Sequence, residues 1–286
     1  MLAQVVLTPT ESKKLIAKAI AKLDVVRQAA AEGMVVIHPS SSTYFIFEEL
    51  TGAKPKTNYW VCGVVTPRGM CVEMAMTLGD RSPRSVKYDP GKLRGLWVIK
   101  NGKVITESTT AELMEQMTAK DVYIKGVNAL DSQGNVGILV GERGGLGVVL
   151  SAWKKKQFTL IFPAGLEKLI PIPVRQAAME AKQTKYEYGM GLPAGLFAYP
   201  DGRSITEIDA VKILSGADAI PIASGGLGGA EGAATLIIKG KNKQVRDALE
   251  FIEQSKGAKL PALRLSNCSD CSVPHCRFPV GDKHWV

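Results

Sequence analysis

Three cysteines close together near the C-terminus form the most distinctive chemical motif of the chain. They follow a C-x2-C-x4-C spacing, and histidines lie nearby in the sequence. Two thiolates three residues apart can bind one metal ion from a tight turn, and zinc takes a fourth ligand such as histidine. The candidate metal ligands are Cys268, Cys271, Cys276 and His284, with His275 as the other histidine that could complete the set.

The cysteine motif leaves three interpretations open. The thiolates can hold zinc, or an iron–sulfur cluster with one exchangeable iron. Cys268 and Cys271 can instead form a redox pair or a reversible disulfide. The thiols can also be inert members of a C-terminal tail. Zinc or an iron–sulfur cluster is therefore the cofactor to test for at this end of the chain.

A run of hydroxyl residues forms a second candidate site. Ser40, Ser41, Ser42 and Thr43 stand between a short apolar strand that ends at His38 and an apolar helical segment. Hydroxyl groups and unpaired backbone N–H groups at a helix N-terminus favour a bound anion. In the alternative interpretation, Ser42 or Thr43 only caps the helix and His38 is an ordinary core histidine. The run therefore predicts an anion site, with His38 as a further candidate for ligand contact, or a helix cap.

The densest glycine stretch, SGGLGGAEG, spans Ser224 to Gly232. It lacks the Lys-Ser/Thr ending of a P-loop, and its spacing differs from the dinucleotide-binding fingerprint. It follows a predicted strand, so its backbone could face a phosphate or a nucleotide. A structural crossing loop uses the same residues, and both interpretations stay open.

A predicted alternation of helices and strands positions these candidate residues. Thr8 and Glu11 have capping-box spacing and Pro9 stands at the first helical position, so a helix begins there. Asn101-Gly102 between two β-type segments predicts a hairpin. The other predicted strands of this part are Met34–His38, Asp121–Gly126, Val136–Val140 and Phe158–Phe162, and the other helices are Tyr44–Leu50, Thr109–Thr118 and a segment through Trp153.

Strands separated by helices of this length predict an α/β fold with a mostly parallel sheet and helices on both faces. Ligands of such sheets bind in a crevice at the carboxyl ends of the strands. The loops after His38, Gly126 and Val140 are therefore expected at one functional edge.

The pattern changes after about Glu187. This order of elements predicts a smaller α+β module of the ferredoxin-like kind. Its predicted helices are Ile205–Leu214 and Asn242–Ser255, and its predicted strands are Ala219–Ile222, Ala234–Ile238 and Pro261–Leu265.

Three parts are expected along the chain. Residues 1–186 form the α/β domain, residues 187–265 the smaller α+β module, and residues 266–286 the cysteine-rich tail. The sequence contains neither an internal repeat nor a long linker.

Four segments resemble ribose-5-phosphate isomerase A in the same order. They are Val35–Leu50 (VVIHPSSSTYFIFEEL), Asp121–Asp131 (DVYIKGVNALD), Gly134–Leu150 (GNVGILVGERGGLGVVL) and Phe162–Val174 (FPAGLEKLIPIPV). Through them the first two-thirds of the chain is similar to the superfamily of ribose-5-phosphate isomerase, glucosamine-6-phosphate deaminase and CoA transferases (NagB/RpiA/CoA-transferase-like). The resemblance implies that superfamily's α/β fold.

The first two segments carry the functional part of the resemblance. In the family the first one cradles the substrate phosphate, which implies that role for Ser40 to Thr43. The second carries the family's catalytic carboxylates, but here the matching positions hold Lys125, Gly126 and Asn128, and only Asp131 keeps an acid. Lysine and asparagine cannot serve as a carboxylate base. The resemblance therefore implies a shared fold but not a standard ribose-5-phosphate isomerase.

The same resemblance implies a set of candidate catalytic residues. Lys125 would be an electrostatic clamp, or a base or amine nucleophile if desolvated, together with Asn128 and Asp131. CoA transferases of the superfamily use a glutamate that forms a thioester, and Glu142 is the acid placed for that role. A surface glutamate beside Arg143 is the alternative interpretation.

Glycines of the second and third segments would let the backbone approach a ligand closely. Tight turns use the same residues, so the glycines alone do not define a site. The candidates are Gly126, Gly144, Gly145 and Gly147.

Composition and charge limit the expected partners. The net charge is +9, but the basic residues are spread along the chain. Nucleic-acid binders usually concentrate charge on one face, so an anionic small molecule is the expected partner and nucleic acid is not. No run of about 18 apolar residues is present, so no membrane association is expected. A homo-oligomer is expected only by analogy with the family.

The start of the chain and its cysteines bear on location. The N-terminal residues lack a basic start followed by an apolar core, so no signal peptide is expected. Five cysteines without such a signal indicate a reducing, cytoplasmic location and no disulfide framework.

Two functions remain in competition. The first is binding, with turnover left open, of a phosphorylated metabolite or CoA ester at the α/β edge, and a transferase or isomerase-like enzyme is the form that turnover would take. The alternative is a metal- or iron–sulfur-dependent redox or accessory protein that acts through the C-terminal cysteines.

Overall fold

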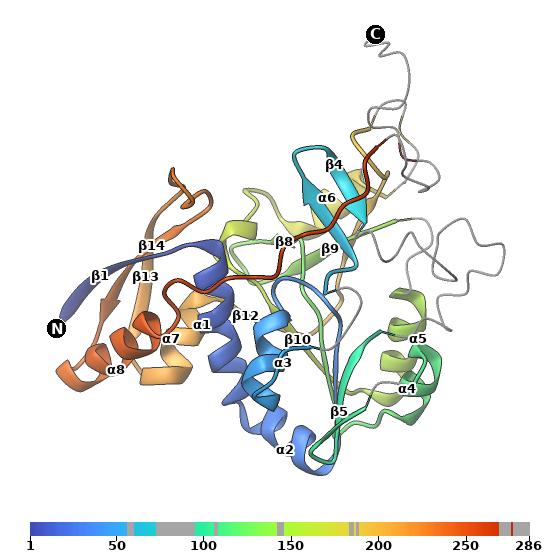
Figure 1. The fold of residues 1–286 in the computed structure, drawn as a ribbon, viewed down its shortest axis with the longest axis horizontal. Helices are drawn as coiled ribbons and strands as arrows, with labels where there is room; N and C mark the ends of the chain where they lie inside the picture. The colour runs from blue at the N-terminus through green and yellow to red at the C-terminus, as the bar shows by residue number, and fades with distance from the viewer. Residues whose placement is uncertain are drawn as a thin grey trace, which may run out of the picture.

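The computed structural model describes residues 1–55, 60–72, 95–105, 108–141, 146–182, 186, 189–268 and 276. A central six-stranded sheet carries helices on both faces, and a smaller three-stranded sheet lies beside it (Figure 1). No helix in these described parts is long and apolar enough to cross a membrane.

The central sheet is mixed and mostly parallel, as the alternation of elements predicted. Its strand order is β12-β10-β7-β2-β5-β6. The first four of these strands pair in parallel, and the last two form an antiparallel edge. The strands are β2 (Met34–Ile37), β5 (Trp97–Lys100), β6 (Lys103–Ile105), β7 (Val122–Ile124), β10 (Thr159–Pro163) and β12 (Arg203–Ile205).

Alternate side chains of the central strands enter two separate cores. Val35, Ile37 and Ile124 belong to the core under the first group of helices, whereas Val36 and Tyr123 belong to the other. The first group is α1 (Pro9–Ala21), α2 (Asp24–Glu32), α3 (Tyr44–Thr51) and α7 (Glu207–Ser215), and the second is α4 (Thr110–Gln116) and α5 (Leu146–Lys156), on the right of Figure 1. Both faces of the sheet are therefore buried, which explains the nearly continuous apolar strands.

Two local sequence signals are confirmed. Thr8 caps α1, its hydroxyl accepts from the backbone N–H of Glu11, and the Glu11 carboxylate accepts from the Thr8 backbone in return. Asn101 and Gly102 have φ angles of 50° and 74° between β5 and β6. Positive φ at both turn positions is the geometry that Asn-Gly favours in a two-residue hairpin.

The smaller sheet joins the two ends of the chain. Its order is β1-β14-β13, all antiparallel, with strands β1 (Leu2–Leu7), β14 (Ala234–Lys239) and β13 (Asp218–Ser224). Helices α7 and α8 (Asn242–Glu253) contact it. Strand β1 was not predicted, because its pairing with β14 is invisible in the local pattern.

The predicted last strand, Pro261–Leu265, is wrong, since these residues form no strand. β1 already occupies the edge of β14 that a closing strand would have used. The segment runs instead across the molecule, in red in Figure 1, where the Trp60 indole N–H donates to the Ala262 carbonyl at 3.3 Å.

Strand β9 (Val136–Val140) is outside the central sheet. It pairs antiparallel with β8 (Ala129–Leu130) and β11 (Gly195–Ala198). The rule for parallel strands therefore does not place the loop after Val140 at the functional edge, and that expectation is corrected. A hairpin turn closed by Asp131 redirects the chain between β8 and β9.

Strand pairing continues past residue 187. β11 and β12 follow that position and pair with β9 and β10, while β1 pairs with β14 of the smaller sheet. The predicted division of the chain at residue 186 stays a prediction. The remaining elements are the hairpin of β3 (Gly63–Thr66) and β4 (Gly69–Val72), the 3-10 helix η3 (Leu166–Lys168) and α6 (Val174–Glu180).

Candidate functional site

The carboxyl ends of three parallel strands bring the candidate loops to one edge of the central sheet. Ile37 is paired with Ile124, and Ile124 with Ile161, so β2 and β7 end at the same level and β10 runs two residues further, to Pro163. The segments that follow them are the hydroxyl run, the segment beginning at Lys125, and η3. Ligands of parallel sheets bind at such an edge.

The hydroxyl run is folded on itself by its own side chains. The Thr43 hydroxyl donates to the His38 carbonyl at 2.6 Å and lies 3.0 Å from the Ser40 hydroxyl oxygen. The backbone N–H of Thr43 donates to the Ser40 hydroxyl at 3.3 Å. Thr43 is the N-cap of α3 but makes no side-chain cap hydrogen bond, so the simple capping role suggested for it is wrong.

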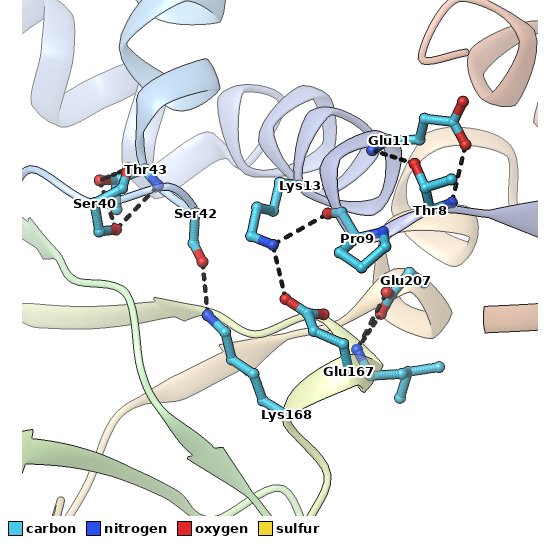
Figure 2. A network of polar contacts seen from close by, with 11 residues as sticks. Thr8, Pro9, Glu11, Lys13, Ser40, Ser42, Thr43, Glu167, Lys168 and Glu207 are labelled. Atoms are coloured by element: carbon cyan, nitrogen blue, oxygen red, sulfur yellow. Dashed lines mark hydrogen bonds and ion pairs between the residues drawn. The ribbon is translucent and has the colours of Figure 1, made fainter. Parts of the chain in front are cut away.

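Ser42 points toward η3 and contacts a lysine that the sequence did not single out. The Lys168 ammonium donates to the Ser42 hydroxyl at 2.7 Å, from across the sheet edge (Figure 2). Ser42 is buried and Lys168 is half-buried. Burial lowers the pKa of Lys168 to about 8, against the opposing effect of the Glu167 carboxylate. No ion pair of Lys168 occurs among the residues that the structure describes.

All three residues of η3 are anchored by side chains from distant elements. The Leu166 backbone N–H donates to both carboxylate oxygens of Glu207, at 3.1 and 3.0 Å. Glu167 accepts from the Lys13 ammonium at 2.8 Å, and Lys168 reaches Ser42, as Figure 2 shows. The short helix that presents Lys168 is therefore fixed from three directions.

Glu207 is the most deeply buried acid of this network, at 1% exposure. Burial raises its pKa to about 7, although the Ser12 hydroxyl and the Leu166 N–H favour the charged form. It is the first residue of α7, where a helix dipole also favours a negative charge. Its carboxylate fixes the turn that carries Lys168.

Gly126 packs directly against the hydroxyl run. A Cβ atom at this position would lie 2.4 Å from the Ser40 hydroxyl oxygen and 3.5 Å from the Ser42 Cβ. A side chain would therefore displace the run. The structure brings Ser40, Ser42, Thr43 and Gly126 together with Lys168, and Ser41 lies half-buried in the same run.

Lys125 and His38 lie at the same edge but on the other face of the sheet. Side chains alternate along a strand. Ile37 and Ile124 enter the core under α1 and α3, so the residues after them face the core that contains Tyr123. Lys168 and Ser42 lie on the α1 side (Figure 2). The predicted site is thus divided into two parts.

Asn128 and Asp131 make contacts that hold the β8–β9 hairpin. Asn128 is exposed, and its side-chain oxygen accepts from the Leu139 backbone N–H at 3.0 Å. Asp131 is buried and accepts from backbone N–H groups of its own turn and from that of Val174 at 3.0 Å. Burial raises the pKa of Asp131, but these donors outweigh it, so the net pKa is lowered. Asp131 has the contacts of a carboxylate that closes a turn and holds the start of α6.

Three further candidates, Glu142, Gly144 and Gly145, lie outside the described residues. Gly147 lies in the first turn of α5, where an added Cβ would meet nothing within 4 Å. No close packing therefore requires glycine at that position. The roles predicted for these residues stay predictions.

The C-terminal metal site is only partly within the described structure. Cys271 and His284 lie outside it, as does His275, whereas Cys268 and Cys276 are described. The Arg68 guanidinium donates to the Cys268 sulfur at 3.8 Å. Among the described residues, no three histidine, cysteine or acidic side chains gather as a metal site would require. None of the four described cysteines forms a disulfide.

Metal content tests the prediction made from the cysteine motif. Full-length protein purified without air should contain about one zinc, or several irons, per chain by elemental analysis. Cys271→Ser should lose most of it, because a two-cysteine set binds more weakly. Wild-type protein without bound metal would leave only the redox and inert interpretations of these thiols.

Sequence reasoning missed Lys13, Glu167, Lys168 and Glu207. Two of them stand in FPAGLEKLIPIPV, a segment that stood out only for its family resemblance. Thr206 and Asp209 have capping-box character, which the structure confirms and which would have located Glu207 at a helix start. A half-buried lysine has no comparable local signal.

Comparisons with known proteins add little to this geometry. No family model and no curated protein matches the chain. Among solved structures, 5-methylthioribose 1-phosphate isomerase from Pyrococcus horikoshii OT3 aligns with a TM-score of 0.31 and 10% sequence identity. The alignment covers 69% of this chain and 55% of that chain, so this chain matches about half of that protein. At this similarity neither a family nor an activity follows.

Proposed function

We propose that the α1 side of the edge binds the phosphate group of a small phosphorylated metabolite. The observation that carries the proposal is the contact of the Lys168 ammonium with the Ser42 hydroxyl at 2.7 Å, at the carboxyl edge of a mostly parallel sheet. Within the described structure this ammonium has no ion-pair partner. A phosphate would supply an ion-pair partner.

The surroundings favour a dianion over an uncharged ligand. Helix α3 begins directly after the hydroxyl run, and a helix N-terminus carries a partial positive charge. The Ser40, Ser42 and Thr43 hydroxyls stand at that N-terminus. A bound phosphate would favour the charged form of Lys168 and so offset the cost of burying it.

The proposed ligand class follows from the sequence resemblance. The four segments that resemble ribose-5-phosphate isomerase A make its superfamily, with glucosamine-6-phosphate deaminase and the CoA transferases, our proposed family. A phosphorylated sugar is then the ligand class that we propose, ahead of a CoA ester. We propose binding and not catalysis at the α1 side. Asp131 is the one acid kept at the positions of the family's catalytic carboxylates, and its carboxylate already accepts from four hydrogen-bond donors.

Ligand-dependent stability tests the phosphate site. Ribose 5-phosphate, other sugar phosphates, CoA esters and inorganic phosphate are added to the protein in thermal-shift and calorimetric titrations. A ligand at 100 times its dissociation constant should add roughly 2.7 kcal/mol of stability. Lys168→Met should weaken the dissociation constant by about 10- to 100-fold, because a charge-assisted hydrogen bond contributes about 1.5–3 kcal/mol. Ser42→Ala should weaken it about fivefold, since a neutral hydrogen bond contributes about 1 kcal/mol.

Lys120→Met is the matched control, because Lys120 is exposed just before β7. It should leave phosphate affinity unchanged. Sugar phosphates that bind wild type and Lys168→Met equally would exclude this site. A response to CoA esters with none to sugar phosphates would transfer the proposal to the other ligand class.

A further inference from the structure

The opposite face of the same edge holds a second group of polar side chains that the phosphate site does not use. The His38 backbone N–H donates to the Ile124 carbonyl at 2.9 Å, and the Lys125 N–H donates to the Ile161 carbonyl at 3.1 Å. The strand ladders thus continue through both residues. Neighbouring strands lie about 4.8 Å apart. Lys125 and His38 therefore stand side by side on one face of the sheet.

A buried tyrosine hydroxyl without a partner in the described structure lies near Tyr123, whose side chain faces the same core. Tyr199 is 5% exposed, and its hydroxyl has no hydrogen-bond partner among the described residues. Burial raises the pKa of Tyr123 well above its ordinary value, and Tyr199 and Cys62 add to that effect. The two tyrosines and Cys62 are thus electrostatic neighbours. A buried polar group left unpaired costs about 1–3 kcal/mol, and such groups often mark functional sites.

Within the described residues, Lys125 has none of the contacts that would make it a structural lysine. It is half-buried, and in the described structure its ammonium makes neither an ion pair nor a hydrogen bond. Burial lowers its pKa to about 8, while Cys62 acts in the opposite direction. At pH 7.5 about a quarter of this amine is then uncharged, against about 0.1% for an ordinary lysine. An uncharged amine is a nucleophile.

The neighbouring histidine, His38, does not place a positive charge beside the Lys125 amine. Burial lowers the pKa of His38 well below its usual range, and the charge of Lys125 lowers it further. Its imidazole is therefore neutral beside the amine. Carboxylates are absent from the interactions that the described structure shows for Lys125, so only the smaller effect of Cys62 favours the charged form of the amine there.

We propose that Lys125 is a nucleophilic amine that forms an imine with the carbonyl group of an aldehyde or ketone. The amine nitrogen adds to the carbonyl carbon, the carbonyl oxygen takes up protons and leaves as water, and a C=N bond forms. Addition of water reverses the step, so it needs neither an oxidant nor a reductant. If one ligand occupies both Lys125 and the phosphate site, it would be a phosphorylated carbonyl compound such as an open-chain sugar phosphate. This identification of the ligand rests on the proposed function.

Reductive trapping with a neutral aldehyde tests Lys125 without using the phosphate site. Full-length protein is treated with glycolaldehyde and cyanoborohydride at pH 7.5, and labelled peptides are quantified by mass spectrometry. Lys125 should be labelled on the order of tenfold faster than the exposed Lys120, because the large uncharged fraction of the Lys125 amine outweighs its reduced basicity and partial burial. Labelling of Lys125 no faster than that of Lys120 overturns the proposal.

Two variants separate this proposal from the phosphate site. Lys125→Arg keeps a cation at the position and should lose the preferential label. Lys168→Met should keep the label at Lys125 although sugar-phosphate binding is weakened. If wild type labels preferentially at Lys125 but binds no phosphate compound, the reactive lysine is supported and only the phosphate site is rejected. The wild-type measurement decides the matter even where a variant fails to fold.

Discussion

Replacing Lys125 with methionine is expected to stabilise the protein at pH 7. The pKa of Lys125 is lowered from 10.5 to about 8 by burial, so the folded state holds its ammonium at a cost. At about 1.4 kcal/mol for each tenfold change, that cost is at most about 3 kcal/mol. Methionine fills similar space without a charge. Urea unfolding should therefore give Lys125→Met a free energy of unfolding higher by up to about 3 kcal/mol.

The difference in free energy of unfolding between Lys125→Met and wild type should depend on pH. Because the folded-state pKa is below the unfolded one, the cost is complete below pH 8 and disappears as the pH rises from 8 to 10.5. The gain of Lys125→Met over wild type should shrink over the same range. Lys120→Met, at an exposed position, should show no gain. A less stable Lys125→Met at pH 7 would mean that the ammonium makes a stabilising contact and is a structural group.

Glu207→Gln is expected to remove a loss of stability that wild type suffers between pH 4.5 and 7. Burial raises the pKa of Glu207 from 4.5 to about 7, so folding favours its protonated form. The contribution of Glu207 to the free energy of unfolding is then highest below pH 4.5. It falls by up to about 3 kcal/mol as the pH rises from 4.5 to 7. Glutamine keeps an oxygen to accept from the Leu166 N–H. At pH 8 the variant should be more stable than wild type by up to that amount.

Two other variants make the result specific to the buried carboxyl group. Glu207→Ala leaves the Leu166 N–H without its acceptor and should be less stable than Glu207→Gln by about 1–3 kcal/mol at every pH, because neither variant titrates at this position. Glu253→Gln, at an exposed position near the end of α8, should leave the pH profile of wild type unchanged. If Glu207→Gln and wild type have parallel profiles from pH 4.5 to 8, then Glu207 titrates normally and its burial does not disfavour the charged form.

Three titratable side chains at the sheet edge have one property in common. Two half-buried lysines and a buried glutamate stand there, and burial disfavours the charged form of each. Residues that cost stability in the folded state are commonly retained for function. A phosphate on the Lys168 side would recover part of that cost, as would imine formation at Lys125, which removes the charge.

Local sequence patterns by themselves determined the α/β architecture and the place of the hydroxyl run. Capping residues such as Thr8 and Glu11, and the Asn101-Gly102 turn, act over three or four residues, so the sequence displays them directly. The apolar strands that end at Ile37 and Ile124 likewise imply parallel neighbours with a shared carboxyl edge. From these signals Ser40 to Thr43 and Lys125 could be placed at that edge.

Only the tertiary structure decided which of these residues meet. The contacts of Lys168 with Ser42, of Glu207 with Leu166 and of Asp131 with Val174 join residues 126, 41 and 43 positions apart. No local pattern encodes such distances, and the same is true of the pairing of β1 with β14. The division of the edge into a Lys168 side and a Lys125 side follows from strand register, because a shift of one residue would send each side chain to the opposite face. Register is set by the packing of both cores together, so it is a property of the folded chain.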